Sequence, residues 1–239
     1  SASTNRAERV SLVWLRSALV AAGLPGALFQ IIAEDRAVGE ALASAAIDKL
    51  FLTGAAATGQ AVAGRLAART VPAVLELSGN DAVFVLAAGD IDMAARAIVW
   101  GMGLNGGATC IAPRRVFVVR ERFEALAIAL QSALAHAPAR TVAAAPRATA
   151  CERIAAAQAA GWHVLGPLPE PGATDMAPCV LVGETTSEPP LPGDLFAPVA
   201  TLQAIDTLDE AVAIDHGAEH ALGAAVFGGS AEAAALADR

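Results

Sequence analysis

The sequence has few aromatic residues, few cysteines, no excess of basic charge and no long uninterrupted apolar run. Aromatic residues make up only 4% of the 239 residues and tyrosine is absent, whereas apolar residues, many of them alanine, make up 55%. A chain of this length has ample core for one large domain or two small ones. Its composition favours closely packed helices against a sheet over an all-β sandwich.

The charge balance argues against a nucleic acid as the main partner. The formal net charge is −8, and binding to phosphates needs a basic face. Four arginines nevertheless gather in one stretch, and we interpret them as a solvated strand end. These residues are Arg114, Arg115, Arg120 and Arg122.

The sequence also argues against a membrane span, a disulfide framework and a metal centre. Mean hydropathy is high, at +0.51, but glycine or proline interrupts both long uncharged windows, 17–33 and 97–113. Cys110, Cys151 and Cys179 are far apart and lack the spacing of metal ligands. We therefore expect a soluble cytoplasmic protein with reduced thiols, bound to neither membrane nor nucleic acid.

Strand-like and helix-like segments alternate along the chain. This order predicts βαβ units and a mostly parallel sheet covered on both faces. Strands are expected at 27–32, 49–54, 72–77, 82–87, 114–119, 178–183, 196–205 and 221–228. Helices are expected at 6–22, 54–69, 91–102, 121–137 and 149–160. A further helix is expected between the strand at 27–32 and about residue 46, and two more begin at 208 and 230. The last helix has no stop signal, which indicates a truncated end.

Two glycines in "TGAAATG" lie where a strand passes into a helix. Gly54 ends the strand and Gly59 falls in the first helical turn. Such a turn can approach a phosphate closely, since a helix N-terminus offers backbone N–H groups. The spacing matches neither G-x-G-x-x-G nor a P-loop. The alternative is that these glycines only end the strand and begin the helix, with no ligand.

Glu76 is a carboxylate inside the apolar strand "VLEL". Burial there would be costly and would raise its pKa, which suits a general base near neutral pH. The alternative is an edge-strand glutamate that faces water.

Cys110 follows a glycine-rich turn just after a helix. Such a thiol is accessible to a substrate, and nearby backbone N–H groups could hold an oxyanion. The alternative is an inert buried thiol, which is our interpretation of Cys151 and Cys179. We expect no catalytic role for the histidines, which are His136, His163, His216 and His220.

Taken together, these motifs resemble the aldehyde dehydrogenase superfamily. The resemblance is carried, in order, by "FLTGAAATG", "LELSGN", "NGGATC" with "RRVFV", "DLFAPV" and "ALGAAVFG". It covers almost the whole chain from about Val10. Glu76 and Cys110 are 34 residues apart, which is the usual separation in the family.

The resemblance implies NAD(P)-dependent oxidation of an aldehyde to a carboxylic acid. Cys110 matches the nucleophile that forms a thiohemiacetal and then a thioester, and Glu76 matches the general base for hydrolysis. Gly54 and Gly59 match the turn near the cofactor's pyrophosphate. Asp194 falls where the family has a glutamate on the nicotinamide ribose, and Phe196 lies beside the ring.

The resemblance further implies a three-layer α/β/α protein. Residues 1–77 would form part of a Rossmann-like NAD(P)-binding domain, and residues 78–239 an incomplete, thiol-bearing catalytic domain. Family chains are about twice as long, so the first βαβ unit of the cofactor domain is expected to be missing. Asp194 is one methylene shorter than the usual glutamate, and "LELSGN" replaces the usual "LELGGK". A homo-oligomer is compatible with the resemblance.

A second class of function stays open. A truncated or degenerate family member could lack dehydrogenase activity and serve as a structural or partner-binding protein. A thiol esterase is a third interpretation, since Cys110 with Glu76 could cleave an activated ester without a cofactor.

Overall fold

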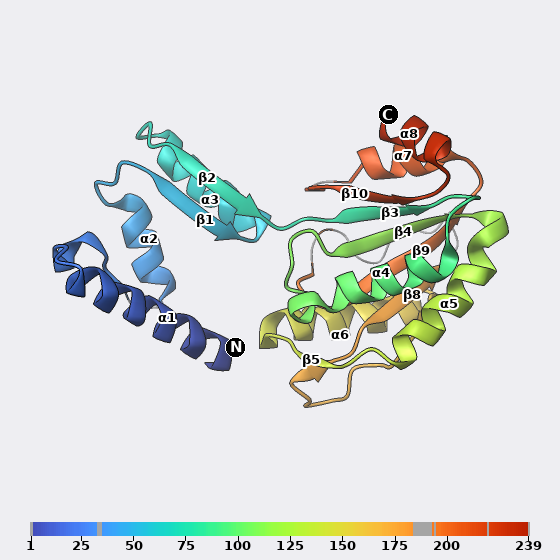
Figure 1. The fold of residues 1–239 in the computed structure, drawn as a ribbon, viewed down its shortest axis with the longest axis horizontal. Coiled ribbons are helices and arrows are strands. Elements are labelled where there is room, and N and C mark those ends of the chain that lie inside the picture. Colours follow the sequence, from blue (N-terminus) through green and yellow to red (C-terminus); the bar gives the residue numbers. More distant parts are fainter. Residues whose placement is uncertain (1, 33–34, 184–192, 194, 219, 239) are drawn as a thin grey trace. The chain divides into compact units, whose positions relative to one another are not determined.

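A computed structural model describes residues 2–32, 35–183, 193, 195–218 and 220–238. The chain divides into two compact units, Ser1–Glu76 and Leu77–Arg239. Figure 1 shows the elements of both units.

The first unit is helical apart from a small two-stranded sheet. The strands β1 and β2 pair with each other and flank helix α3 in the sequence. Few of the unit's described side chains are buried. Leu66 is 1% exposed, whereas Phe51 of β1 is 71% exposed. Its elements are α1 (Ala2–Ala21), a 3-10 helix η1 (Gly26–Leu28), α2 (Arg36–Ser44), β1 (Leu50–Gly54), α3 (Ala56–Ala67) and β2 (Ala73–Leu77).

The predicted strand at 27–32 is wrong. Its first residues lie in η1, and no residue of this segment that the structure describes pairs in a sheet. Pro25 precedes η1 with a φ of −57°, a value that suits the start of a helical turn. Leu28 and Ile32 are largely exposed. A short apolar run forms a strand only where a partner strand lies beside it, and this segment has none among the described residues.

The second unit is built on a six-stranded sheet of order β10-β3-β4-β9-β8-β6. All neighbouring strands pair in parallel except β6 and β8, so the predicted mixed α/β fold with a mostly parallel sheet is confirmed. Its strands are β3 (Asp81–Val85), β4 (Pro113–Val119), β5 (Arg140–Thr141), β6 (His163–Leu165), β7 (Asp175–Met176), β8 (Cys179–Gly183), β9 (Val199–Ile205) and β10 (Ala224–Phe227). Its helices are α4 (Ile91–Gly103), η2 (Leu104–Gly107), η3 (Arg120–Arg122), α5 (Phe123–Ala135), α6 (Ala144–Ala159), α7 (Leu208–His216) and α8 (Ser230–Ala237).

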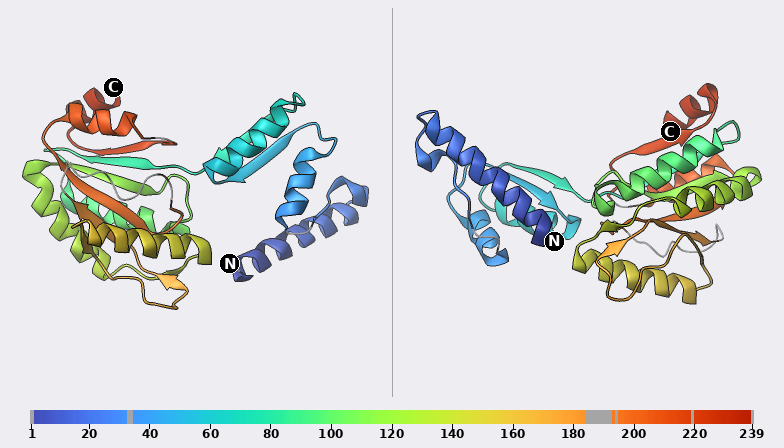
Figure 2. Two further views of the ribbon diagram at one scale, coloured as in Figure 1. Left: turned by 180° about the vertical axis from the view of Figure 1, so that it is seen from behind. Right: turned by 60° about the horizontal axis from the view of Figure 1, so that its bottom comes forward.

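Alternate residues of the central strands pack on opposite faces of this sheet. Val116 and Val118 of β4 join one apolar cluster with α4 and α5. Phe117 points the other way and packs with α7 and α8, while α6 covers β8 and the start of β9 on that same side. The unit therefore has three layers (Figure 2), as expected when both faces of a parallel sheet are covered. Among the described helices, none is long and apolar enough to cross a membrane.

Candidate active site

The segment before Cys110 is a tight left-handed turn. Asn105, Gly106 and Gly107 have φ values of 52°, 64° and 82°. Local hydrogen bonds hold the turn: the Ala108 N–H donates to the Asn105 carbonyl (3.1 Å) and the Thr109 hydroxyl to the Leu104 carbonyl (3.2 Å). Cys110 follows in a half-buried position. The sequence thus places the thiol on a well-defined turn between α4 and β4.

Both glycines of this turn lie against other backbone segments. A Cβ atom on Gly106 would lie 2.6 Å from the Thr141 carbonyl oxygen. A Cβ atom on Gly107 would overlap the peptide between Ala197 and Pro198, at 2.7 Å from the Ala197 carbonyl oxygen. Any larger residue would push these segments apart, so both sterics and the positive φ require glycine here.

A third glycine packs against Cys110 itself. A Cβ atom on Gly79 of "LELSGN" would overlap the Cys110 carbonyl oxygen and would lie 3.2 Å from Cδ1 of Leu222. Three of the motifs singled out in the sequence, around Gly79, Cys110 and Leu222, therefore meet around the backbone of Cys110. A fourth motif, "DLFAPV", joins them, because its Ala197–Pro198 peptide packs against Gly107.

Asp81 joins two of these segments by hydrogen bonds. It accepts from the N–H groups of Leu222 (2.8 Å) and Gly223 (3.1 Å). Burial raises the pKa of this carboxyl, and the two backbone hydrogen bonds oppose that shift. No local signal in the sequence indicates this role of Asp81, because its partners lie more than a hundred positions further along the chain.

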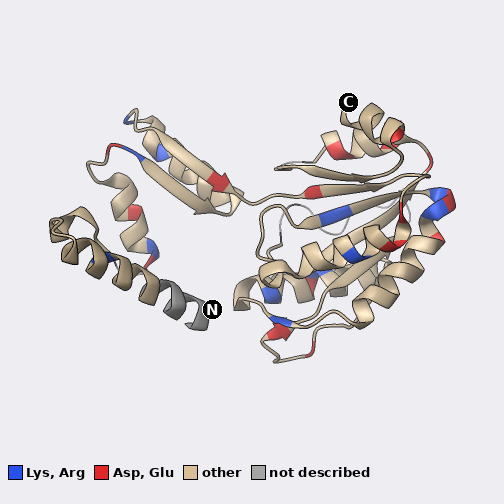
Figure 3. Cartoon of the chain, in the orientation of Figure 1, with Lys and Arg blue, Asp and Glu red and all other residues tan. Residues whose placement is uncertain are grey.

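The interpretation of Arg114 and Arg115 as solvated residues is wrong. They are 1% and 2% exposed at the start of β4, just after the Cys110 turn, where Figure 3 shows blue on the strand. Arg114 donates to the carbonyls of Gly107 and Ala197, each at 2.5 Å. Arg115 donates to the Asn80 carbonyl (2.9 and 2.7 Å) and pairs with Asp215 (2.6 Å). These acceptors offset part of the cost of burying the two guanidinium groups. Arg120, in contrast, is exposed and pairs with exposed Asp206.

The predicted cofactor residues of the second unit lie in the segment before β9. Phe196 is half-buried, and its φ of 45° is uncommon for a residue with a side chain. Such backbone strain is found mostly at functional sites. Asp194 lies outside the described residues.

The other predicted site residues belong to the first unit. Gly54 is the last residue of β1, and Gly59 is buried in the first turns of α3. A Cβ atom on Gly54 would meet no atom within 4 Å, which leaves open space above this turn. Glu76 lies in β2 and is exposed within this chain. It thus has the water-facing position of the alternative interpretation.

Selective thiol labelling tests the positions of the cysteines. Cys179 is fully buried on β8, and desolvation raises its pKa to about 12, so its reactive thiolate is scarce at pH 8. We expect iodoacetamide to label half-buried Cys110 in the native chain while Cys179 stays unmodified until urea is added. Peptide mass spectrometry measures both, and labelling of native Cys179 at the rate of Cys110 would contradict this picture.

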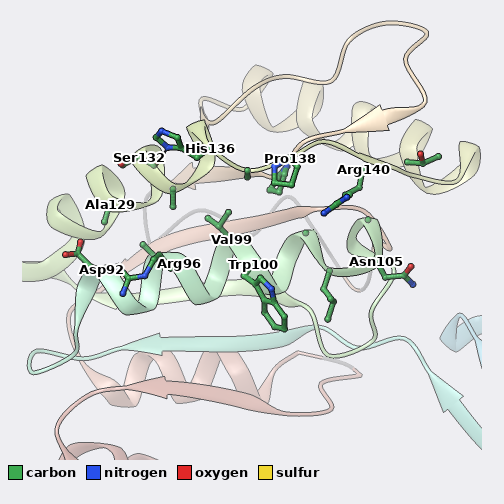
Figure 4. A pocket seen from close by; sticks show the side chains of 18 residues that line it. Asp92, Arg96, Val99, Trp100, Asn105, Ala129, Ser132, His136, Pro138 and Arg140 are labelled. Carbon is green, nitrogen blue, oxygen red and sulfur yellow. Dashed lines mark hydrogen bonds between the residues drawn. The ribbon is translucent and has the colours of Figure 1, made fainter.

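An open cavity of about 850 Å³ lies beside the turn that precedes Cys110. Figure 4 shows the side chains of α4, including Arg96 and Trp100, and those of α5 and the segment after it, including His136 and Arg140. The turn contributes Leu104, Asn105 and Gly106 to the lining. Cys110 is not among the described residues that line this cavity, so the cavity adjoins the turn without containing the thiol.

The family follows from a match over nearly the whole sequence. A sequence model of the aldehyde dehydrogenase family matches residues 5–239. The chain belongs to the aldehyde dehydrogenase family. Among aldehyde dehydrogenase relatives, the succinate-semialdehyde dehydrogenase [NADP(+)] of Deinococcus radiodurans is 30% identical over 223 residues, which are 86% of this chain and 46% of that protein. The chain thus spans about half the length of the curated relatives that it matches over most of its sequence.

Solved aldehyde dehydrogenases share the fold. The NADP-dependent glyceraldehyde-3-phosphate dehydrogenase from Bacillus halodurans, solved with NADP, has a TM-score of 0.84 and 24% identity, over 93% of this chain and 49% of that one. The NAD-dependent benzaldehyde dehydrogenase from Corynebacterium glutamicum has a TM-score of 0.75 and 24% identity, over 85% and 47%. The expected architecture of an aldehyde dehydrogenase is thereby confirmed for this chain.

Proposed function

We propose that this chain carries the residues of an NAD(P)-dependent aldehyde dehydrogenase, with Cys110 as the nucleophile. The observation that carries the proposal is the packing around the Cys110 turn. Gly79, Gly106 and Gly107 each allow a backbone contact that a side chain would prevent. A free thiol held on a turn of this kind suits nucleophilic catalysis, which needs the reacting atom in one fixed position.

In the proposed reaction, the Cys110 thiolate attacks the carbonyl carbon of an aldehyde and forms a thiohemiacetal. The backbone N–H of Cys110 donates to the developing oxyanion. A nicotinamide cofactor, held by the turn after Gly54 and the segment of Phe196, would supply the acceptor for the hydride that is lost when the thiohemiacetal oxyanion becomes the thioester. Glu76 then takes a proton from water, whose oxygen attacks the thioester carbon. The C–S bond breaks, which releases the acid and restores the Cys110 thiolate, and Glu76 returns its proton to solvent.

The residues present fit a dinucleotide in two places. The first is the turn from Gly54 into α3, where open space lies above Gly54 and the helix N-terminus suits a pyrophosphate. The second is the segment of Asp194 and Phe196, which we assign to the nicotinamide riboside. Residues 1–77 would thus be part of the NAD(P)-binding domain and residues 78–239 the catalytic domain.

The substrate is a small-molecule aldehyde, in keeping with the aldehydes in the names of related enzymes. The three cysteines are free in the structure, which supports a reducing compartment such as the cytoplasm. The choice between NAD and NADP is open, since related enzymes named for each are similar to this chain.

The direct test is NADH or NADPH absorbance from the purified 239-residue chain. The assay contains NAD or NADP and a panel of short aliphatic and aromatic aldehydes. We expect aldehyde-dependent absorbance at 340 nm, with the corresponding acid as product. Absence of reduced cofactor with every aldehyde, from chain whose Cys110 still reacts with a thiol reagent, would rule out dehydrogenase activity for this chain.

A second candidate is cofactor-independent thiol esterase activity. One observation favours it: Cys110, Gly79, Arg114 and the Ala197–Pro198 peptide all belong to the second unit, so the nucleophile turn needs no cofactor domain to form. Hydrolysis of p-nitrophenyl acetate without cofactor measures this activity. If aldehyde oxidation is absent while ester hydrolysis depends on Cys110, the esterase is the better assignment.

A further inference from the structure

Arg114 links two segments with different roles in the proposed function. One is the turn before the nucleophile Cys110, and the other is the Phe196 segment at the nicotinamide site. Its Nη2 group donates to the Gly107 carbonyl, three residues before Cys110, at 2.5 Å. Its Nη1 group donates to the Ala197 carbonyl, one residue after Phe196, at 2.5 Å. One buried guanidinium thus holds the nucleophile turn and the Phe196 segment together.

Both segments are also anchored independently of Arg114. The Ala197 carbonyl accepts a second hydrogen bond from the Val199 N–H (2.8 Å), and the Pro198 carbonyl accepts one from the Cys179 N–H (3.0 Å). The Phe196 segment is therefore fixed to β8 and β9. The Cys110 turn is held by its own local hydrogen bonds. Loss of Arg114 would leave each segment folded and still in contact at Gly107, but would remove the two hydrogen bonds that fix the distance and angle between them.

The side chain suits this link for a chemical reason. A guanidinium is planar and always charged, and its N–H donors form a rigid fork that reaches two acceptors at once. A lysine ammonium at the same place is a point charge on a flexible stem. A lysine could reach one carbonyl well but would not fix the angle between the two.

We propose that Arg114 is a positioning residue that sets the distance between the Cys110 thiol and the nicotinamide site beside Phe196. The proposal rests on the proposed dehydrogenase function. Formation of a covalent bond to Cys110 needs only the thiol and its turn. Oxidation of the bound aldehyde also needs the cofactor at the right distance, so Arg114 acts mainly on the oxidation.

Arg115 provides a matched control. It is the next residue, is equally buried and also donates to a backbone carbonyl. Its partners are Asn80 and Asp215, which lie outside both the Cys110 turn and the Phe196 segment. Arg115→Met therefore reproduces the loss of a buried arginine from β4 while the link made by Arg114 stays intact.

The kinetic test separates oxidation from acylation in Arg114→Met and Arg114→Lys. NADH formation from an aldehyde reports oxidation, and the burst of p-nitrophenolate from p-nitrophenyl acetate reports acylation of Cys110. We expect Arg114→Met to lower the rate of NADH formation by about 100-fold, as for a misplacement of roughly 1 Å, with KM for the aldehyde and the burst rate within about 3-fold of the parent. Arg114→Lys should recover part of the loss. Equal losses in both rates, or no loss in either, would overturn the proposal.

Hydrogen–deuterium exchange tests the link without any catalysis. Amides of 105–110 and 195–199 should exchange faster in Arg114→Met, and also in Arg114→Lys if the methionine variant does not fold, while Arg115→Met leaves 195–199 unchanged. Unchanged exchange in both segments would overturn the proposal even if the enzyme is active. If the parent chain forms no NADH but exchange rises as expected, the link stands and the dehydrogenase function fails.

Discussion

Replacement of Cys110 by alanine is expected to lower NADH formation by at least about 10³-fold, because no other group in the proposed reaction can form the thioester. The effect should fall on kcat, whereas the fold should be retained, since Cys110 is only half-buried on a turn that its neighbours hold. Initial rates over a range of aldehyde concentrations measure the change.

Cys151→Ala is the matched control for this experiment. Cys151 is also a free, half-buried cysteine, but it lies on α6, away from the Cys110 turn in the sequence. Its replacement should leave the rate within about 2-fold, as for a substitution outside the active site. Substantial activity in Cys110→Ala, or equal losses in both variants, would remove Cys110 from the proposed mechanism.

Replacement of Gly107 by alanine should produce the second-largest effect, on both stability and activity. The φ of 82° is strained for alanine, and the new Cβ atom would overlap the Ala197–Pro198 peptide. We expect strain and overpacking together to lower the free energy of unfolding by about 3 kcal/mol or more. The displaced turn should also lower activity by about 100-fold.

Gly161→Ala measures the cost of backbone strain alone, without the steric overlap that Gly107→Ala creates. Gly161 has a φ of 89°, similar to that of Gly107, but a Cβ atom there would meet no atom within 4 Å. Its substitution should cost only about 1 kcal/mol, the usual cost of a left-handed alanine. Urea unfolding followed by circular dichroism compares the two. Equal midpoints would show that Gly107 makes no close approach in solution.

Motifs in the sequence predicted most of the second unit and much of the site. Short β-branched strands such as "RRVFVV" and the glycines of "NGGATC" carry local signals, because a buried strand and a left-handed turn each restrict residue type at their own positions. These signals identified β4 and the turn before Cys110 without any long-range information.

Element boundaries were harder to predict. We expected the helix after residue 140 to begin at 149, but α6 begins at Ala144 and holds Pro146 in its first turn. Proline is tolerated there because the first N–H groups of a helix have no partner within it. The two-residue strands β5 and β7 escaped prediction as well, since their pairing depends on the fold around them.

The burial of two arginines could not be predicted from the sequence. Local charge predicted solvated side chains at Arg114 and Arg115, yet both side chains are buried. Their acceptors include Ala197, 83 residues away, and Asn80, 35 residues away. A single sequence cannot indicate that these carbonyls approach β4. The only local hint was a pair of charges at the start of an apolar strand.

Mass spectrometry of the Cys110 peptide tests the proposed mechanism most directly. Glu76→Gln should slow hydrolysis of the thioester, so incubation with NAD and an aldehyde should leave an acyl group on Cys110. The peptide should gain the mass of the aldehyde less two hydrogens, and the gain should require both the aldehyde and NAD. NADH formation with no acyl group on Cys110, or an acyl group on another residue, would contradict the mechanism.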